Sequence, residues 1–255
     1  MTLPNRISDA IRSFWDEKAR EDPYWYVSSS CPYGTPRDIA AFWASGERIW
    51  GDIKAAVRYN PEPTHTVIEI GCGVGRITRA IAQDVGHVDA SDVSSEMLHI
   101  ARRADIPNVT FRATEGFSLA PLPNKCADFV LAYCVFQHLP SSTALRTYLG
   151  EMVRVAKPGA IVAFTLTPRD WQFYCMPLLR IRAYLRECFG RTGPKGLYRR
   201  EWVGIRPSRI TVHRASSISL RCVVLHNDKW LFFGERQVPV ARSLQASFKG
   251  ALRKQ

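Results

Sequence analysis

Residues 67–78 read Val67-Ile68-Glu69-Ile70-Gly71-Cys72-Gly73-Val74-Gly75-Arg76-Ile77-Thr78. A short apolar run of strand length comes first, three glycines at alternate positions follow, and an amphipathic segment begins after them. Glycines suit such a turn because a Cβ would forbid its backbone conformations and keep a ligand away from the main chain. The free N–H groups at the start of the next helix can face an anion. The pattern therefore predicts a strand, a ligand-binding loop and a helix.

An acidic residue follows this loop at the expected end of the next strand. Asp92 stands 21 positions after Gly71, where a carboxylate can accept hydrogen bonds from both hydroxyls of a ribose. Together with the glycine loop, it indicates an adenosine-containing cofactor. A dinucleotide-binding loop would have the pattern Gly-x-Gly-x-x-Gly, whereas position 76 here is Arg and Glu69 lies just before the loop.

With these residues the chain resembles the class I S-adenosylmethionine-dependent methyltransferases. Their loop pattern of an acidic residue, Gly, x, Gly, x, Gly is matched by Glu69, Gly71, Gly73 and Gly75, and their second acidic position by Asp92. The resemblance is dense over residues 66–166. It implies that the cofactor is S-adenosylmethionine, held by Glu69, Gly71, Cys72, Gly73, Gly75, Asp92, Val93, Met97, Glu115, Gly116 and Tyr133.

Three later blocks extend the resemblance. Residues 111–116 look like the segment that meets the adenine amino group, which would assign N6 recognition to Glu115. Residues 127–130 look like the fourth strand, with Tyr133 at its mouth beside the reaction centre, and residues 152–159 look like the turn before the fifth strand. Two positions depart from the family pattern, because Glu115 replaces the commoner Asp or Asn and Ala160 replaces the second Gly of a Pro-Gly-Gly turn.

The order of elements predicts an α/β fold. Helical patterns at residues 7–19 and 39–59 flank a Pro/Ser/Gly-rich loop at residues 23–36, and strands then alternate with helices from Thr66. Such alternation implies a parallel sheet with helices on both faces. We therefore expect a Rossmann-like, doubly wound sheet of seven strands, mostly parallel, with an antiparallel C-terminal hairpin and an insertion before the last two strands.

Five regions follow from this layout. They are an N-terminal helical cap (1–62), a cofactor-binding core (63–166), a basic substrate-side insertion (167–217), a strand hairpin that completes the sheet (218–236) and a basic tail (237–255). The expected strands are residues 67–70, 87–90, 109–111, 127–133, 160–165, 219–225 and 230–233, and the expected core helices are 76–84, 95–103 and 142–155.

Composition narrows the class of protein. The 255 residues are 46% hydrophobic and 23% charged, without the roughly 18 consecutive apolar residues of a membrane span. The N-terminus has no apolar signal segment, so we expect a cytoplasmic protein. Seven scattered cysteines without a CxxC pair argue against a disulfide framework and against a zinc site, and we expect no metal.

Charge is unevenly distributed along the chain. Residues 1–164 hold 17 Lys and Arg against 18 Asp and Glu, whereas residues 165–255 hold 18 against 5. The basic end permits an anionic partner: a substrate, a nucleic acid or a peripheral lipid surface. Charge alone does not choose among these partners, and no feature of the sequence predicts an oligomeric state.

Methyl transfer needs an aligned acceptor and exclusion of water rather than a metal or a nucleophilic side chain. The expected catalytic residues are Tyr133 and His138, which lies five residues further on and is a general-base candidate for a hydroxyl or amine acceptor. The alternative is that His138 caps or packs the helix that begins near Ser141.

Substrate contacts are expected from two aromatic regions. Trp15 and Tyr26 in the N-terminal segment are candidates for a lid, or they simply pack a helix onto the sheet. Trp171, Arg199 and Trp202 in the insertion combine aromatic and guanidinium groups, which suits an anionic or glycosylated acceptor, although a solvated basic face has a similar composition.

The leading hypothesis is a methyltransferase that acts on a small molecule, such as an anionic, lipid or sugar-containing metabolite. One alternative is an RNA-modifying enzyme that uses the basic C-terminal segment, although no RNA-binding module is recognisable. A second alternative is a catalytically silent protein that binds S-adenosylmethionine without turnover.

Overall fold

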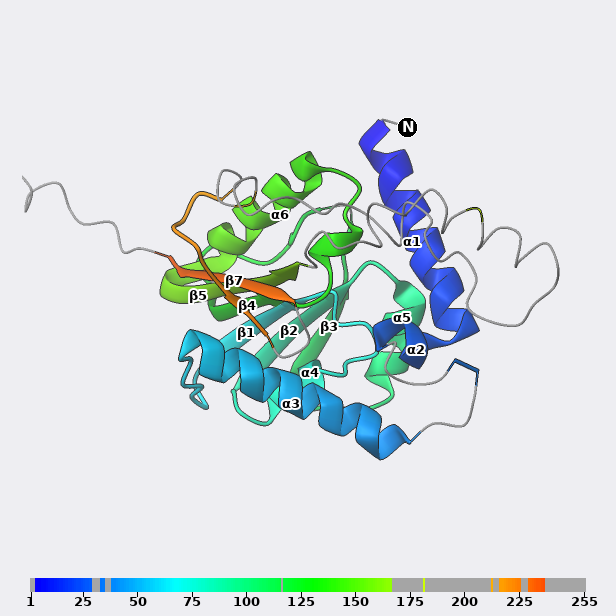
Figure 1. The fold of residues 1–255 in the computed structure, drawn as a ribbon, viewed down its shortest axis with the longest axis horizontal. Helices are drawn as coiled ribbons and strands as arrows, with labels where there is room; N and C mark the ends of the chain where they lie inside the picture. The colour runs from blue at the N-terminus through cyan, green and yellow to red at the C-terminus, as the bar shows by residue number, and fades with distance from the viewer. Residues whose placement is uncertain are drawn as a thin grey trace, which may run out of the picture.

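The computed structural model describes residues 3–28, 33–34, 38–115, 117–166, 181, 212, 216–225 and 229–236. In this part of the chain, seven strands form one sheet in the order β3-β2-β1-β4-β5-β7-β6 (Figure 1). The strands are β1 (Thr66–Ile70), β2 (His87–Asp92), β3 (Val109–Ala113), β4 (Ala127–Ala132), β5 (Ala156–Leu166), β6 (Arg221–Val224) and β7 (Trp230–Glu235). β1 to β5 are parallel, and β7 pairs antiparallel with β5 and β6. The predicted mixed sheet and its C-terminal hairpin are confirmed.

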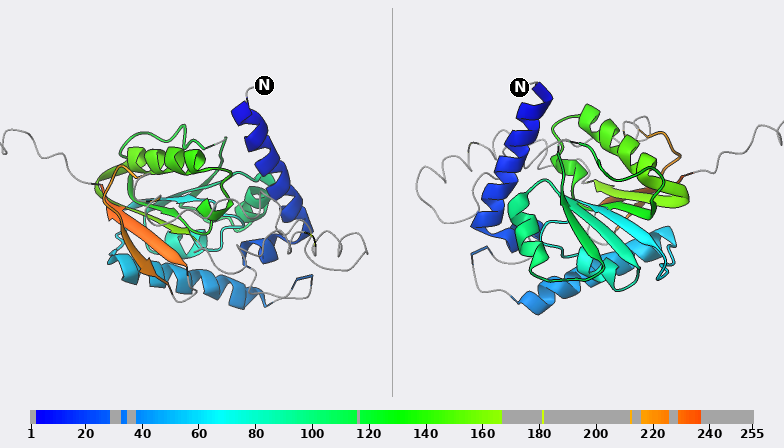
Figure 2. Two further views of the ribbon diagram at one scale, coloured as in Figure 1. Left: turned by 45° about the horizontal axis from the view of Figure 1, so that its top comes forward. Right: turned by 180° about the vertical axis from the view of Figure 1, so that it is seen from behind.

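Helices cover both faces of the sheet (Figure 2). They are α1 (Leu3–Glu21), α2 (Pro23–Val27), α3 (Ile39–Val57), α4 (Thr78–Ala82), α5 (Ser95–Arg102) and α6 (Ser142–Val155), with a 3₁₀ turn η1 (Phe136–His138). α6 packs on one face, where its buried residues recur every three or four positions and meet Ile68, Val130 and Phe164. α3, α4 and α5 pack on the opposite face.

The strand order places a ligand-binding edge at the centre of the sheet. β1 lies between β2 and β4, and the register pairs Ile70 with both Ser91 and Ala132. The carboxyl ends of three parallel strands therefore meet at one edge, at the point where the order of strands reverses direction. Open α/β sheets bind ligands at this switch point.

The N-terminal segment differs from the prediction in one place. Residues 23–27 were expected in a loop, but they form the short helix α2. Asp22 caps this helix, because its Oδ1 accepts a hydrogen bond of 3.1 Å from the N–H of Trp25. Pro23 at the first helical position needs no N–H partner there, so a Pro-rich sequence still starts a helix.

Other predicted regions are described only in part. Of the basic insertion, residues 181, 212 and 216–217 are described, and the tail from 237 lies outside the described residues. Among the described helices, none combines the length and the apolar character needed to cross a membrane.

Candidate cofactor and methyl-transfer site

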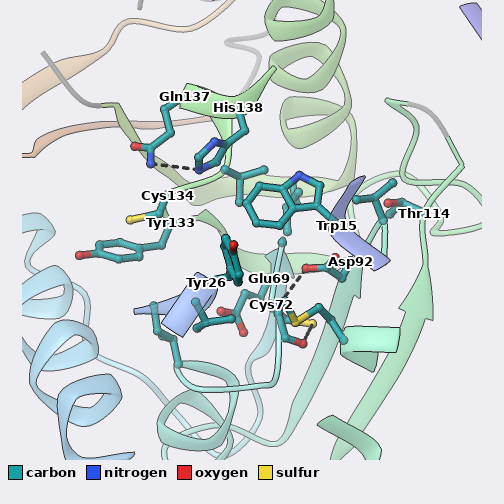
Figure 3. Close-up of a pocket in the computed structure, with 18 of the residues that line it drawn as sticks. Trp15, Tyr26, Glu69, Cys72, Asp92, Thr114, Tyr133, Cys134, Gln137 and His138 are labelled. Carbon is teal, nitrogen blue, oxygen red and sulfur yellow. Dashed lines mark hydrogen bonds between the residues drawn. The ribbon is translucent and has the colours of Figure 1, made fainter. Parts of the chain in front are cut away.

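A cavity of about 290 Å³ lies at the carboxyl ends of β1, β2 and β4 (Figure 3). Eleven of the predicted site residues line it: Trp15, Tyr26, Glu69, Gly71, Cys72, Gly73, Asp92, Val93, Met97, Tyr133 and His138. The fold therefore gathers residues from the N-terminal helices, the glycine loop and the segment after β4 around one space.

Two of the remaining predicted residues are described by the structure and lie outside this cavity. Gly75 and Glu115 are described but are not among its lining residues, and Glu115 is exposed. Gly116, Trp171, Arg199 and Trp202 lie outside the described residues. Thr114, one residue before Glu115, is buried and lines the cavity instead.

Two glycines of the loop permit close packing around the cavity. Gly71 and Gly73 adopt φ angles of +71° and +55°, which only glycine adopts at little cost. A Cβ on Gly71 would lie 2.2 Å from Cγ2 of Val135, and a Cβ on Gly73 would lie 2.6 Å from Cγ2 of Val27. The loop is thus closed from one side by the segment after β4 and from the other by α2.

Asp92 is held in place by backbone donors. Its Oδ2 accepts a hydrogen bond of 2.8 Å from the N–H of Gly73, and its Oδ1 accepts one of 2.9 Å from the N–H of Ser94. Burial raises the pKa of Asp92 above its ordinary value, while these N–H groups oppose the rise. The carboxylate links the glycine loop to α5 and keeps acceptor capacity for the hydroxyls of a ribose.

Glu69 supplies a second carboxylate at the end of β1. Its side chain accepts a hydrogen bond of 2.5 Å from the hydroxyl of Thr78, and the residue is 2% exposed. Burial raises the pKa of Glu69 to about 7, with Thr78 and the charge of Arg76 opposing the rise. A cationic group in the cavity would favour ionisation of this carboxylate.

Arg76 connects the loop to the N-terminal helices. Its guanidinium donates hydrogen bonds to the hydroxyls of Ser45 at 3.0 Å and Ser28 at 3.4 Å, and to the carbonyl of Val27 at 3.5 Å. The same residue lines the cavity. In the sequence, Arg76 serves only to exclude a dinucleotide loop, although a charged residue directly after the glycines was a sign of a second role.

Trp15 and Tyr26 cover the cavity from the N-terminal segment. The ring centroids of Trp15 and His138 are 5.0 Å apart at an interplanar angle of 77°, and Figure 3 shows Trp15 between His138 and Asp92. Tyr26 is buried and lies near Glu69 in the same view. Both aromatic residues are therefore close to the glycine loop and Asp92.

The segment after β4 forms the other end of the cavity. Cys134 has a φ of +61°, and its N–H donates a hydrogen bond of 2.7 Å to the hydroxyl of Thr165 on β5. Nε2 of His138 lies 3.2 Å from Nε2 of Gln137. Tyr133 extends away from Trp15 (Figure 3) and packs among the residues between the sheet and α3. His138 is thus the predicted catalytic residue nearer to the aromatic cover.

One polar pair in the wall of the cavity, Thr114 and Tyr148, was not predicted from the sequence. Thr114 forms a side-chain hydrogen bond with Tyr148 of α6, and burial raises the pKa of this tyrosine to about 12. Both residues line the cavity. The available signal was Thr114 in the polar run that follows β3, directly before the predicted Glu115. Among the described residues, no group of three or more His, Cys, Asp or Glu side chains has the arrangement of a metal site.

The comparison with known families agrees with this geometry. Residues 68–164 match the family described as a methyltransferase domain. The chain is 34% identical over 106 residues to malonyl-[acyl-carrier protein] O-methyltransferase of Pectobacterium atrosepticum, covering 40% of each chain. It is 26% identical over 205 residues to a ubiquinone/menaquinone biosynthesis C-methyltransferase of Burkholderia vietnamiensis, covering 77% of this chain and 82% of that one.

The matches at higher identity are partial. The chain spans 40% of the length of the Pectobacterium protein and 38% of a demethylmenaquinone methyltransferase from Tropheryma whipplei. Among solved structures, magnesium protoporphyrin IX methyltransferase from Synechocystis with bound S-adenosylhomocysteine has a TM-score of 0.62 at 16% identity, covering 90% of this chain and 99% of that one. That likeness extends the common fold beyond the matched domain. Residues 68–164 thus match a methyltransferase domain, and the chain as a whole is similar in fold to S-adenosylmethionine-dependent methyltransferases.

Proposed function

We propose that this protein transfers the methyl group of S-adenosylmethionine to a small-molecule acceptor. One observation carries the proposal: the glycine loop, Asp92 and Glu69 converge with His138 on a single cavity at the switch point of the sheet. Methyltransferases that act on quinones, an acyl-carrier conjugate and a porphyrin are similar to this chain. Their acceptors differ, so the resemblance supports the reaction and leaves the acceptor to experiment.

The lining residues fit the chemical groups of this cofactor. Asp92 can accept the ribose hydroxyls, and the backbone of Gly71 and Gly73 lines the cavity beside it. Glu69 offers a buried carboxylate to the ammonium of the methionyl part. Met97, Thr114 and Phe117 line the same cavity as Asp92 and would hold the adenine.

Bound S-adenosylmethionine supplies an electrophilic methyl group, so the residues of the chain have three tasks. Trp15 and Tyr26 exclude water from above the glycine loop. The segment from Tyr133 to His138 positions the acceptor at the ends of β4 and β5. His138 takes the proton of a hydroxyl or amine acceptor through its imidazole.

Calorimetric titration with S-adenosylhomocysteine, with NADH as the control ligand, tests this function. We expect micromolar binding of S-adenosylhomocysteine alone. In Asp92→Ala the loss of the charge-assisted ribose bonds should weaken binding by about 2 to 4 kcal/mol. Asp89→Asn is the matched control, because Asp89 lies on the same strand but pairs with Arg112 outside the cavity.

The possible results separate the hypotheses. If the wild-type protein binds neither ligand, the methyltransferase proposal fails. Equal affinity of the wild type and Asp92→Ala for S-adenosylhomocysteine would contradict the assignment of Asp92. Tight binding without transfer to any acceptor would favour the silent protein. A cytoplasmic location stays a prediction from the sequence.

A further inference from the structure

Helix α1 lies over the cavity although it is outside the matched methyltransferase domain. Ser8, Ile11 and Trp15 line the cavity, and their spacing of three and four residues places them on one face of the helix. Figures 1 and 2 show α1 running beside α5. The helix can therefore contact a ligand in the cavity directly and can also act on it through α5.

Asp16 attaches α1 to the start of α5. Its Oδ1 accepts a hydrogen bond of 2.6 Å from the hydroxyl of Ser94 and one of 3.2 Å from the N–H of Glu96. Both bonds end on a charged acceptor, and the N-terminus of a helix favours negative charge. A second link, between Arg20 and Glu96, is an ion pair of 2.8 Å whose side chains are 60% and 42% exposed, so it should contribute little.

Ser94 connects this attachment to the proposed ribose site. Its hydroxyl donates to Asp16, while its N–H donates to Oδ1 of Asp92 at 2.9 Å. Oδ2 of Asp92 then accepts from the N–H of Gly73. Asp16 does not line the cavity, yet it is one residue removed from the carboxylate that would hold the ribose.

The other wall of the cavity is contacted by the residue next to Asp16. Trp15 packs edge to face with His138 in the segment after β4. Asp16 and Trp15 are consecutive in α1 and thus contact both walls of the cavity. Asp16 contacts the segment after β2, and Trp15 contacts the segment after β4. Release of the Asp16 attachment would loosen the part of α1 that carries Trp15.

We propose that Asp16 is a positioning residue that couples cofactor binding at Asp92 to closure of α1 over the cavity. The inference rests on the function proposed above. The coupling works in both directions, because a ribose that fixes Asp92 also fixes Ser94, and a fixed α1 keeps Trp15 over the ligand. A residue outside the cavity thereby sets the affinity for the cofactor.

Titration of Asp16→Ala with S-adenosylhomocysteine tests the proposal. We expect affinity about tenfold lower than in the wild type, as the loss of two bonds to a charged group would cause. Arg20→Gln is the matched control, because it removes only the exposed α1–α5 ion pair, and it should stay within about twofold of the wild type. Asp16→Asn keeps an oxygen acceptor for Ser94 and should restore most of the affinity.

Hydrogen exchange distinguishes coupling from a merely structural role. In the wild type, S-adenosylhomocysteine should slow amide exchange in residues 8–20, and this ligand-dependent protection should be lost in Asp16→Ala. A structural role alone would change exchange equally with and without ligand. Should Asp16→Ala not fold, Ser94→Ala removes the hydroxyl that donates to Asp16; because that hydroxyl also accepts a hydrogen bond from the N–H of Met97, the comparison of exchange with and without ligand, rather than affinity alone, is the readout.

Three results would overturn the proposal: wild-type affinity in Asp16→Ala, an equal loss of affinity in Arg20→Gln, or no protection of α1 by ligand in the wild type. Failure of the wild type to bind S-adenosylhomocysteine is a different result. It would remove the proposed function, and this inference with it.

Discussion

Glu69 is a carboxylate whose charge should respond to pH near neutrality. Burial raises its pKa to about 7 from 4.5, so the folded state retains a proton that the unfolded chain has lost over this window. The stability of the free protein should therefore fall as pH rises from about 4.5 to 7 and then level off. Ligand affinity should show the opposite dependence on pH, because a ligand ammonium pairs with the deprotonated form of Glu69. The affinity should therefore rise as pH rises.

We expect S-adenosylhomocysteine to bind about tenfold more tightly at pH 8 than at pH 6, since the ionised fraction of a group with a pKa near 7 rises about that much. Calorimetry across this range measures the effect. Glu69→Gln should flatten the profile, whereas His138→Ala should preserve it. A profile unchanged in Glu69→Gln would assign the dependence to another group.

His138 should affect turnover rather than cofactor affinity. Its imidazole lies at the cavity beside Gln137 and Trp15, so removal of a general base should lower turnover by about a hundredfold or more once an acceptor is identified. S-adenosylhomocysteine affinity should change little. His99→Ala, on the exposed side of α5, is the control. Normal turnover in His138→Ala would leave this histidine with a packing role.

The contact between α2 and the glycine loop can be tested with Gly73→Ala. The new methyl group would occupy a φ of +55° and lie 2.6 Å from Cγ2 of Val27, so we expect loss of about 1 to 2 kcal/mol of stability from backbone strain alone and weaker ligand binding. Urea unfolding and calorimetry measure the two effects.

Two variants separate strain from contact. Gly34→Ala also introduces a Cβ at positive φ, +63°, but with no atom within 4 Å, so it should lose stability without loss of ligand affinity. Val27→Ala combined with Gly73→Ala should restore part of the binding. If the double variant is no better than Gly73→Ala, the contact with α2 is not what limits the cofactor.

The same elements show how far local sequence predicts structure. Residues 142–155 were predicted as a helix with the bounds of α6, and the structure shows why: its buried residues recur with the helical period and Ser141 caps it. Residues 23–27 were predicted as part of a loop because residues 23–36 are rich in Pro, Ser and Gly. The capping residue Asp22 and the Pro at the first helical position are visible in the sequence. A helix of five residues is nevertheless too short to show the helical period of apolar residues by which helices are recognised.

At the scale of the whole molecule, the sheet and the cavity floor were predictable, whereas the cover was predicted only as two candidate residues, Trp15 and Tyr26, without the contacts that hold it. Glu69, the glycines and Asp92 lie in consecutive strands and loops whose order fixes their meeting point. Trp15 meets His138, and Asp16 meets Ser94, only because α1 packs across the finished core. Such contacts depend on the docking of elements far apart in the chain, which no local pattern specifies. The family resemblance likewise pointed to Glu115, whereas the packed structure has Thr114 in the wall.

The distribution of charge over the chain leads to a final prediction, about salt. Residues 1–164 are nearly neutral, residues 165–255 carry an excess of 13 positive charges, and every described lining residue except Lys229 belongs to the first part. Cofactor binding should therefore change by less than about threefold between 50 and 200 mM salt. Binding of RNA to the basic part would release counterions and fall by orders of magnitude over the same range.

Titrations at the two salt concentrations, with S-adenosylhomocysteine and with a single-stranded RNA, together with an assay for transfer of labelled methyl groups to the RNA, decide between the acceptor classes. A small-molecule enzyme should show salt-insensitive cofactor binding and no transfer of labelled methyl groups to RNA, even at low salt where a basic protein binds RNA non-specifically. Methyl-labelled RNA would overturn the small-molecule hypothesis. Non-specific attraction delivers RNA to the surface but does not place a base or a ribose hydroxyl beside His138, so labelling would require specific binding of the RNA.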